Sequence, residues 1–277
     1  MKTKIKLLVL DIDGTLAGDD NAISPRVLST VRAVQDRGVA VAIATGRMYQ
    51  SALRFHQTIK SPLPLMAYQG AFIKDPHTQT LYCHHHLPRH ITFALLNHLA
   101  PQEAQQALSI HLYIDDELHV REIIDDTEAY AVRSGIRPKP VGDLQQMLLG
   151  NQHLETTKLL ALSQDTQLVE HLLFQISQLY PSEEVYLTRS VDTFFEATHP
   201  LANKGAAVKY LAENLLELKP DQIMTIGDNF NDLEMLAYAG IGIAMGDAPQ
   251  AVQANADWVA PSVNQDGVAV ALEHFLL

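Results

Sequence analysis

The sequence predicts an α/β protein, with a doubly wound parallel sheet into which an α+β domain is inserted. Strand and helix signals alternate near both ends of the chain, whereas the middle contains hairpin signals. A chain of 277 residues is long enough for two medium domains, each with its own core. We therefore expect residues 1–82 and 191–277 to form one domain and residues 83–190 to form the inserted one.

The first segment indicates buried strands joined by helices. Strands are expected at residues 5–10, 39–44 and 65–68. The first of these is apolar apart from Lys6 and rich in branched side chains, as in a strand that is buried on both faces. Ser24 and Pro25 signal a helix start, the amphipathic run that follows ends at Gly38, and another helix is expected to begin near Thr45. This order implies right-handed crossovers and a parallel sheet.

The middle segment has a different pattern. The stretch SIHLYIDDELHVREI predicts a hairpin with Asp115 and Asp116 as its turn. Helical runs are expected at residues 125–134 and 164–179, with a strand near 158–162. Alternation then returns, with strands at residues 194–198, 222–226 and 241–244 and a helix capped by Asn203. The two alternating segments would together complete one sheet.

Composition excludes several classes of protein. Twenty basic and 32 acidic residues give a net charge of −12, which argues against nucleic acid or an anionic membrane as the main partner. Cys83 is the only cysteine, so no disulfide can form within the chain. The apolar stretch near the N-terminus ends at Asp11, too early for a signal peptide, and no run of 18 apolar residues follows. A cytoplasmic location is expected, while the oligomeric state is not determined.

Polar clusters follow several of the predicted strands. They are Asp11 to Thr15, Thr45 to Arg47, Asn203 to Gly205 and Gly227 to Asp232. Ligands of open parallel sheets bind beyond the carboxyl ends of the strands, so these clusters are expected to converge. The carboxylates of Asp11, Asp13 and Asp228 offer only oxygen ligands, which suits Mg²⁺. Thr45 and Lys204 could contact a phosphate, and a metal beside a phosphate site indicates phosphoryl transfer.

The two aspartates after the first strand suit two different roles in that chemistry. Asp11 could attack phosphorus and form an aspartyl-phosphate that water later opens. Asp13 could protonate the leaving alcohol and then activate the water. The presence of a carboxylate at Asp13 favours an enzyme that hydrolyses its aspartyl-phosphate rapidly over a protein that stays phosphorylated for long.

These residues carry a resemblance to a known family. DIDGT at residues 11–15, ATGR at 44–47, NKG at 203–205 and GDNFND at 227–232 resemble, in order, the four motifs of the haloacid dehalogenase superfamily of phosphatases. The insertion resembles the C2B-like α+β cap of its Cof-type subfamily, which selects the substrate. The resemblance implies a Rossmann-like core, Mg²⁺ dependence and hydrolysis of small phosphomonoesters, often sugar phosphates or phosphorylated cofactors.

Roles follow by position from this resemblance. Asp11 resembles the nucleophile, and Asp13 resembles the acid/base that also gives Mg²⁺ its main-chain carbonyl. Asp228 matches a further metal carboxylate, and Asp232 matches a residue that supports the metal site. The matches to phosphate contacts are the amide of Ile12, Thr45, Gly46, Lys204 and Asn231.

Two positions and the reaction itself stay open. The family often has Asn-Gly-Ala after the third strand, where this chain has Gln69-Gly70-Ala71, and the role of Gln69 is unassigned. Arg47 could contact the site or face solvent. One alternative function is a phosphomutase or phosphotransferase acting on hexose phosphates. Another is a non-catalytic phosphate-binding protein, against which Asp13 and Lys204 count. The sequence does not identify the physiological substrate.

Overall fold

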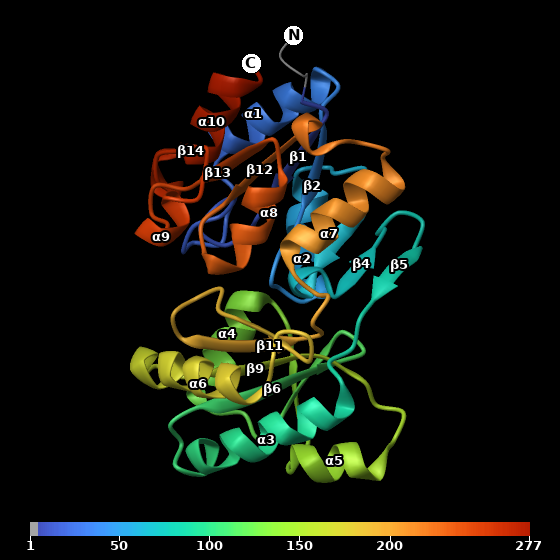
Figure 1. Ribbon diagram of the computed structural model, residues 1–277, viewed down its shortest axis with the longest axis vertical. Helices are drawn as coiled ribbons and strands as arrows, with labels where there is room; N and C mark the ends of the chain where they lie inside the picture. Colours follow the sequence, from blue (N-terminus) through green and yellow to red (C-terminus); the bar gives the residue numbers. More distant parts are fainter. Residues whose placement is uncertain (1–4) are drawn as a thin grey trace. The chain divides into compact units, whose positions relative to one another are not determined.

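The computed structural model describes residues 5–277, which form two compact units. The first unit joins the segment up to Cys83 with Asn203–Leu277, and the second, the inserted unit, is His84–Ala202 (Figure 1). Within residues 5–277, no helix is both long and apolar enough to cross a membrane.

The first unit is built on a parallel sheet of five strands. In spatial order these are β14 (Trp258–Val259), β13 (Ile241–Ala244), β12 (Ile223–Gly227), β1 (Leu7–Leu10) and β2 (Ala40–Ile43). Leu10 of β1 pairs with Ile226 of β12 on one side and with Ile43 of β2 on the other. The chain leaves β1 towards β2 and later returns to the opposite side of β1 at β12. The strand order therefore reverses between β1 and β12, which is where such folds bind ligands.

Helices lie between and after these strands and confirm the doubly wound α/β fold. They are α1 (Pro25–Asp36), α2 (Tyr49–Thr58), α7 (Lys204–Tyr210), α8 (Leu233–Tyr238), α9 (Gln250–Gln253) and α10 (Gly267–Phe275). Ser24 caps α1 as predicted, because its side chain accepts a hydrogen bond from the amide of Val27. Residues of α7 and α8 pack in one apolar cluster with Leu7 and Val9 of β1, and α1 contacts α10 (Figure 1).

Two local predictions for the first unit were wrong. Helix α2 begins at Tyr49 and not near Thr45, because the Thr45 carbonyl accepts the amide of Gln69 and its hydroxyl accepts the amide of Arg47. The third predicted strand, β3 (Leu65–Ala67), pairs antiparallel with β4 (Phe72–Lys74), which is followed by β5 (Leu81–His84) in a separate small sheet. An isolated bridge between Ala44 and Met66 links β3 to the main sheet.

The inserted unit is an α+β domain with a six-stranded sheet. The spatial order is β10 (Tyr186–Thr188), β11 (Phe194–Thr198), β9 (Thr156–Leu162), β6 (Ser109–Ile114), β7 (Glu117–Val120) and β8 (Pro138–Pro140). Asp115 and Asp116 have φ values of 53° and 57°, which confirms the predicted tight hairpin turn. Helices α3 (Arg89–Ala104), α5 (Leu144–Gly150) and α6 (Thr166–Leu179) share an apolar cluster with this sheet, and α4 spans Asp125–Ser134.

Strand β11 does not join the parallel sheet as the sequence suggested. It pairs antiparallel with β9 and with β10 inside the inserted unit. Phe195 and Ala197 belong to the apolar cluster of that unit, so burial of this face favours the antiparallel pairing. The inserted unit consequently extends to Ala202, beyond the expected boundary at residue 190.

Candidate active site

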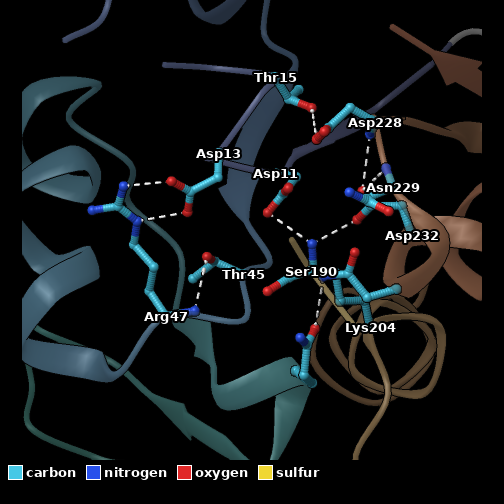
Figure 2. A network of polar contacts seen from close by, with 12 residues as sticks. Asp11, Asp13, Thr15, Thr45, Arg47, Ser190, Lys204, Asp228, Asn229 and Asp232 are labelled. Atoms are coloured by element: carbon cyan, nitrogen blue, oxygen red, sulfur yellow. Dashed lines mark hydrogen bonds and ion pairs between the residues drawn. The ribbon is translucent and has the colours of Figure 1, made fainter. Parts of the chain in front are cut away.

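Two aspartates lie at the point where the strand order reverses. Asp11 directly follows β1, and its amide donates to the carbonyl of Ile226 over 3.1 Å. Asp228 directly follows β12, and one of its carboxylate oxygens accepts the Thr15 hydroxyl at 3.0 Å (Figure 2). Gly14 lets the two loops approach, because its φ is +74° and an added Cβ would lie 2.3 Å from Asp228 Oδ2.

A buried lysine joins two of the acidic side chains. Lys204 Nζ lies 2.7 Å from Asp11 Oδ1 and 2.6 Å from Asp232 Oδ1, and Lys204 is fully buried (Figure 2). The other oxygen of Asp232 accepts the amides of Asp228 and Asn229 at 2.9 and 3.0 Å. Asp232 thereby fixes both the lysine and the start of the loop that carries Asp228.

The site holds excess negative charge in a buried environment. Carboxylate oxygens of Asp11, Asp228 and Asp232 lie within 4.8 Å of one another. Burial, reinforced by Asp232 and Asp13 and opposed by Lys204, raises the pKa of Asp11 to about 7. Burial and the charges of Asp11 and Asp232 also raise the pKa of Asp228. Burial alone would lower the pKa of Lys204, but the carboxylates of Asp11 and Asp232 raise it.

This electrostatic pattern fits a divalent cation. Three carboxylates share one buried lysine, and the raised pKa values of Asp11 and Asp228 indicate that ionising these two side chains is costly without further positive charge. An all-oxygen donor set suits a hard cation such as Mg²⁺ rather than a soft metal.

Asp13 lies beside these carboxylates but has a partner of its own. Its two oxygens accept hydrogen bonds from Arg47 Nε at 2.7 Å and Nη2 at 2.6 Å (Figure 2). Arg47 Nη2 also donates to Asn21 Oδ1 at 2.7 Å, and the guanidinium carbon lies 4.8 Å from the centroid of the Phe55 ring. The Arg47 side chain is only 10% exposed, so it contacts the site and does not face solvent. The ATGR motif drew attention to Arg47, but its sequence neighbours did not predict whether its side chain faces the site or solvent.

Three of the residues expected to contact phosphate, Thr45, Gly46 and Asn231, lie around Gln69. Thr45 and Asn231 are buried, and Asn231 Nδ2 donates to Gln69 Oε1 over 3.1 Å. Gly46 lies against the same glutamine, since an added Cβ would be 2.5 Å from Gln69 Nε2. Ile12 is buried between the two aspartates of its loop, and the phosphate contact of its amide stays a prediction. The sequence assigned no role to Gln69. Its position directly after the third predicted strand was the signal that could have placed it at this edge of the sheet.

The fold and the site define a doubly wound α/β protein with a buried group of carboxylates at the carboxyl edge of its sheet, and comparison with known proteins gives its family. The model of the haloacid dehalogenase-like hydrolases matches residues 8–272. The chain is 28% identical over 281 residues to 5-amino-6-(5-phospho-D-ribitylamino)uracil phosphatase YitU of Bacillus subtilis, covering 99% of each protein. It is 25% identical to phosphatase YwpJ of the same organism, covering 98% of this chain and 100% of that one.

A solved structure agrees with this assignment. The crystal structure of a haloacid dehalogenase-like hydrolase from Bacteroides thetaiotaomicron matches 98% of this chain and 99% of its own, with a TM-score of 0.82 and 25% identity. The chain belongs to the haloacid dehalogenase-like hydrolases, and within them it is a phosphatase, which confirms the resemblance to the Cof-type enzymes.

Proposed function

We propose that the protein is a Mg²⁺-dependent phosphatase that hydrolyses small phosphomonoesters through an aspartyl-phosphate on Asp11. The observation that carries this proposal is the buried group of Asp11, Asp228 and Asp232 with Lys204 at its side. Lys204 fixes one oxygen of Asp11, which leaves the carboxylate oriented for attack.

The reaction proceeds in two displacements at phosphorus. In the first, a carboxylate oxygen of Asp11 forms a bond to phosphorus, the bond from phosphorus to the ester oxygen breaks, and Asp13 gives its proton to the departing alcohol. In the second, Asp13 takes a proton from water, the water oxygen attacks phosphorus, and the acyl phosphate bond breaks. Asp11 is regenerated, Asp13 is again protonated, and inorganic phosphate leaves.

Asp11 and Asp228 would hold Mg²⁺ through their carboxylates, together with the main-chain carbonyl of Asp13. When bound, the ion neutralises charge on the phosphoryl oxygens and on the acidic residues. Asp232 would act as a support, because its two oxygens already accept Lys204 and the amides of Asp228 and Asn229. Thr45, Gly46, Asn231, Lys204 and the amide of Ile12 would contact the phosphate.

A relative supports the proposed class of substrate. YitU is named for hydrolysis of a phosphate on a ribityl chain attached to a uracil, and it aligns with 99% of this chain. We propose sugar phosphates or phosphorylated cofactors as substrates, with the inserted unit selecting the group that carries the phosphate.

Phosphate release tests the proposal directly. The purified protein is assayed against sugar phosphates, nucleotides, flavin mononucleotide and pyridoxal phosphate, with MgCl₂ or with EDTA. We expect release from at least one ester that requires Mg²⁺, loss of release in Asp11→Asn, and no change in Asp36→Asn, which alters an exposed aspartate on α1. A protein that releases no phosphate from any ester contradicts the proposal, and an isomerised hexose phosphate would instead indicate a mutase.

A further inference from the structure

Three consecutive residues after β3 have an uncommon backbone conformation. Tyr68, Gln69 and Gly70 have φ values of 53°, 60° and 93°. Only glycine adopts this region freely, and side-chain-bearing residues held there cluster at functional sites. The surrounding contacts must therefore fix this segment.

Main-chain bonds attach the segment to the loop after β2. The amide of Tyr68 donates to the carbonyl of Arg47, and the amide of Gln69 donates to the carbonyl of Thr45, both at 2.9 Å. On the other side, an added Cβ on Gly70 would lie 2.5 Å from the Cβ of Ala207 in α7. The segment thus lies between the Thr45 loop and the helix that begins with Lys204.

The left-handed backbone directs the Gln69 side chain towards the loop after β12. Gln69 is fully buried, its Oε1 accepts from Asn231 Nδ2, and its Nε2 lies close to Gly46. An amide nitrogen has two hydrogens, so the bond to Gln69 also fixes the direction of the second N–H of Asn231. A side chain one methylene shorter would carry its amide closer to its own backbone and away from Asn231.

We propose that Gln69 is a positioning residue of the phosphate-binding site, which connects Gly46 to Asn231 and aims the Asn231 amide at the bound phosphate. This inference rests on the proposed function, because it takes Gly46 and Asn231 as phosphate contacts. Gln69 acts through Asn231 and takes no part in bond making.

Substitutions at Gln69 and Gln79 distinguish the effect of shortening the side chain from the effect of relieving the left-handed backbone. Asparagine tolerates the left-handed region, so Gln69→Asn keeps the backbone and shortens the side chain. Gln69→Gly relieves the backbone and removes the amide altogether. Gln79 is the matched control, because it has a φ of 62° in an exposed turn. Far-UV circular dichroism and thermal unfolding establish that each variant is folded.

Two measurements test the inference: the kinetics of phosphomonoester hydrolysis, and calorimetric binding of inorganic phosphate in MgCl₂. For both Gln69 variants we expect KM and the Kd of phosphate to rise about tenfold, with a smaller change in kcat, as for the loss of one well-placed hydrogen bond. Gln79→Asn and Gln79→Gly should leave both constants unchanged.

The outcomes distinguish this inference from the function on which it rests. Wild-type phosphate affinity in a folded Gln69→Asn protein overturns the role of Gln69, and so does a wild-type protein that binds no phosphate. If the wild-type protein binds phosphate but hydrolyses no ester, the proposed function fails while the calorimetric comparison still decides the role of Gln69.

Discussion

Arg47 holds the carboxylate of Asp13 through two hydrogen bonds, of 2.7 and 2.6 Å, although the residues follow different strands of the sheet. A guanidinium bound through two hydrogen bonds fixes the plane of the carboxylate. This fixed orientation suits the proposed mechanism, in which Asp13 exchanges protons with the leaving alcohol and then with water.

Arg47→Lys should therefore slow the opening of the aspartyl-phosphate. Lysine keeps the positive charge but cannot form the bidentate pair of hydrogen bonds with Asp13, so we expect kcat to fall about tenfold or more. Phosphoenzyme trapped by acid quench should increase at steady state. Arg32→Lys, at an exposed position of α1, is the control. Unchanged kcat and unchanged phosphoenzyme in Arg47→Lys would show that the pair has no part in turnover.

Asp13→Asn should separate the two displacements more completely. The variant keeps Asp11, but the asparagine can neither protonate the leaving group nor activate water, so we expect kcat to fall about 10²- to 10⁴-fold. A substrate with a good leaving group, such as an aryl phosphate, should still phosphorylate Asp11. Mass spectrometry of the quenched protein would then find the phosphate on Asp11, and a phosphate on another residue would refute the assignment of the nucleophile.

The stability of the metal-free protein should depend on pH through Asp11. Its pKa is about 7 when folded, against an ordinary value of 3.8, so the folded state binds more protons than the unfolded state between those values. The free energy of unfolding should accordingly fall as pH rises from about 4 to about 7. Thermal unfolding in EDTA measures this slope, which should be smaller in Asp11→Asn and in wild-type protein with MgCl₂. Identical slopes in all three samples would contradict the expectation.

Lys204→Met should destabilise the protein as well as inactivate it. The change leaves Asp11 and Asp232 buried without their common cation, at a cost of about 3 kcal/mol. Urea unfolding of the variant should show this loss, and MgCl₂ should recover part of it. Lys209→Met, at an exposed position of the same helix, should have little effect. A Lys204→Met protein as stable as the wild type would mean that the acidic group does not need the lysine.

Gly14→Ala should weaken the metal site by crowding Asp228. A Cβ at this position would lie 2.3 Å from Asp228 Oδ2, so the carboxylate must move, and we expect the Mg²⁺ concentration for half-maximal activity to rise about tenfold or more. Gly38→Ala is a matched control, because its φ of +84° is equally unfavourable for alanine but an added Cβ meets nothing within 4 Å. Equal Mg²⁺ dependence in the two variants would argue that crowding is unimportant.

Much of the site was predictable because its chemistry is local in sequence. A buried strand followed by Asp11 and Asp13, and another followed by Asp228, were sufficient to predict convergence at the edge of a parallel sheet. The caps at Ser24 and Asn203 and the turn at Asp115 were predicted for the same reason, since each depends on a few adjacent residues.

The parts that were missed depend on tertiary contacts. The direction of Arg47 is set by Asp13, Asn21 and Phe55, which lie elsewhere in the sequence. The pairing of β11 with β9 follows from burial inside the inserted unit, although the apolar pattern of the strand fits either sheet. The role of Gln69 depends on a left-handed backbone, which a glutamine does not signal.

The pairing of β1 with β12 has a consequence for the synthesis of the protein. During translation Asp11 is incorporated early, whereas Lys204, Asp228 and Asp232 are incorporated only after the whole inserted unit. Because His84–Ala202 is contiguous, that unit can fold on the nascent chain while β1 still lacks its neighbour. Translation that stops before residue 232 thus yields a fragment in which the acidic group of Asp11, Asp228 and Asp232 is incomplete.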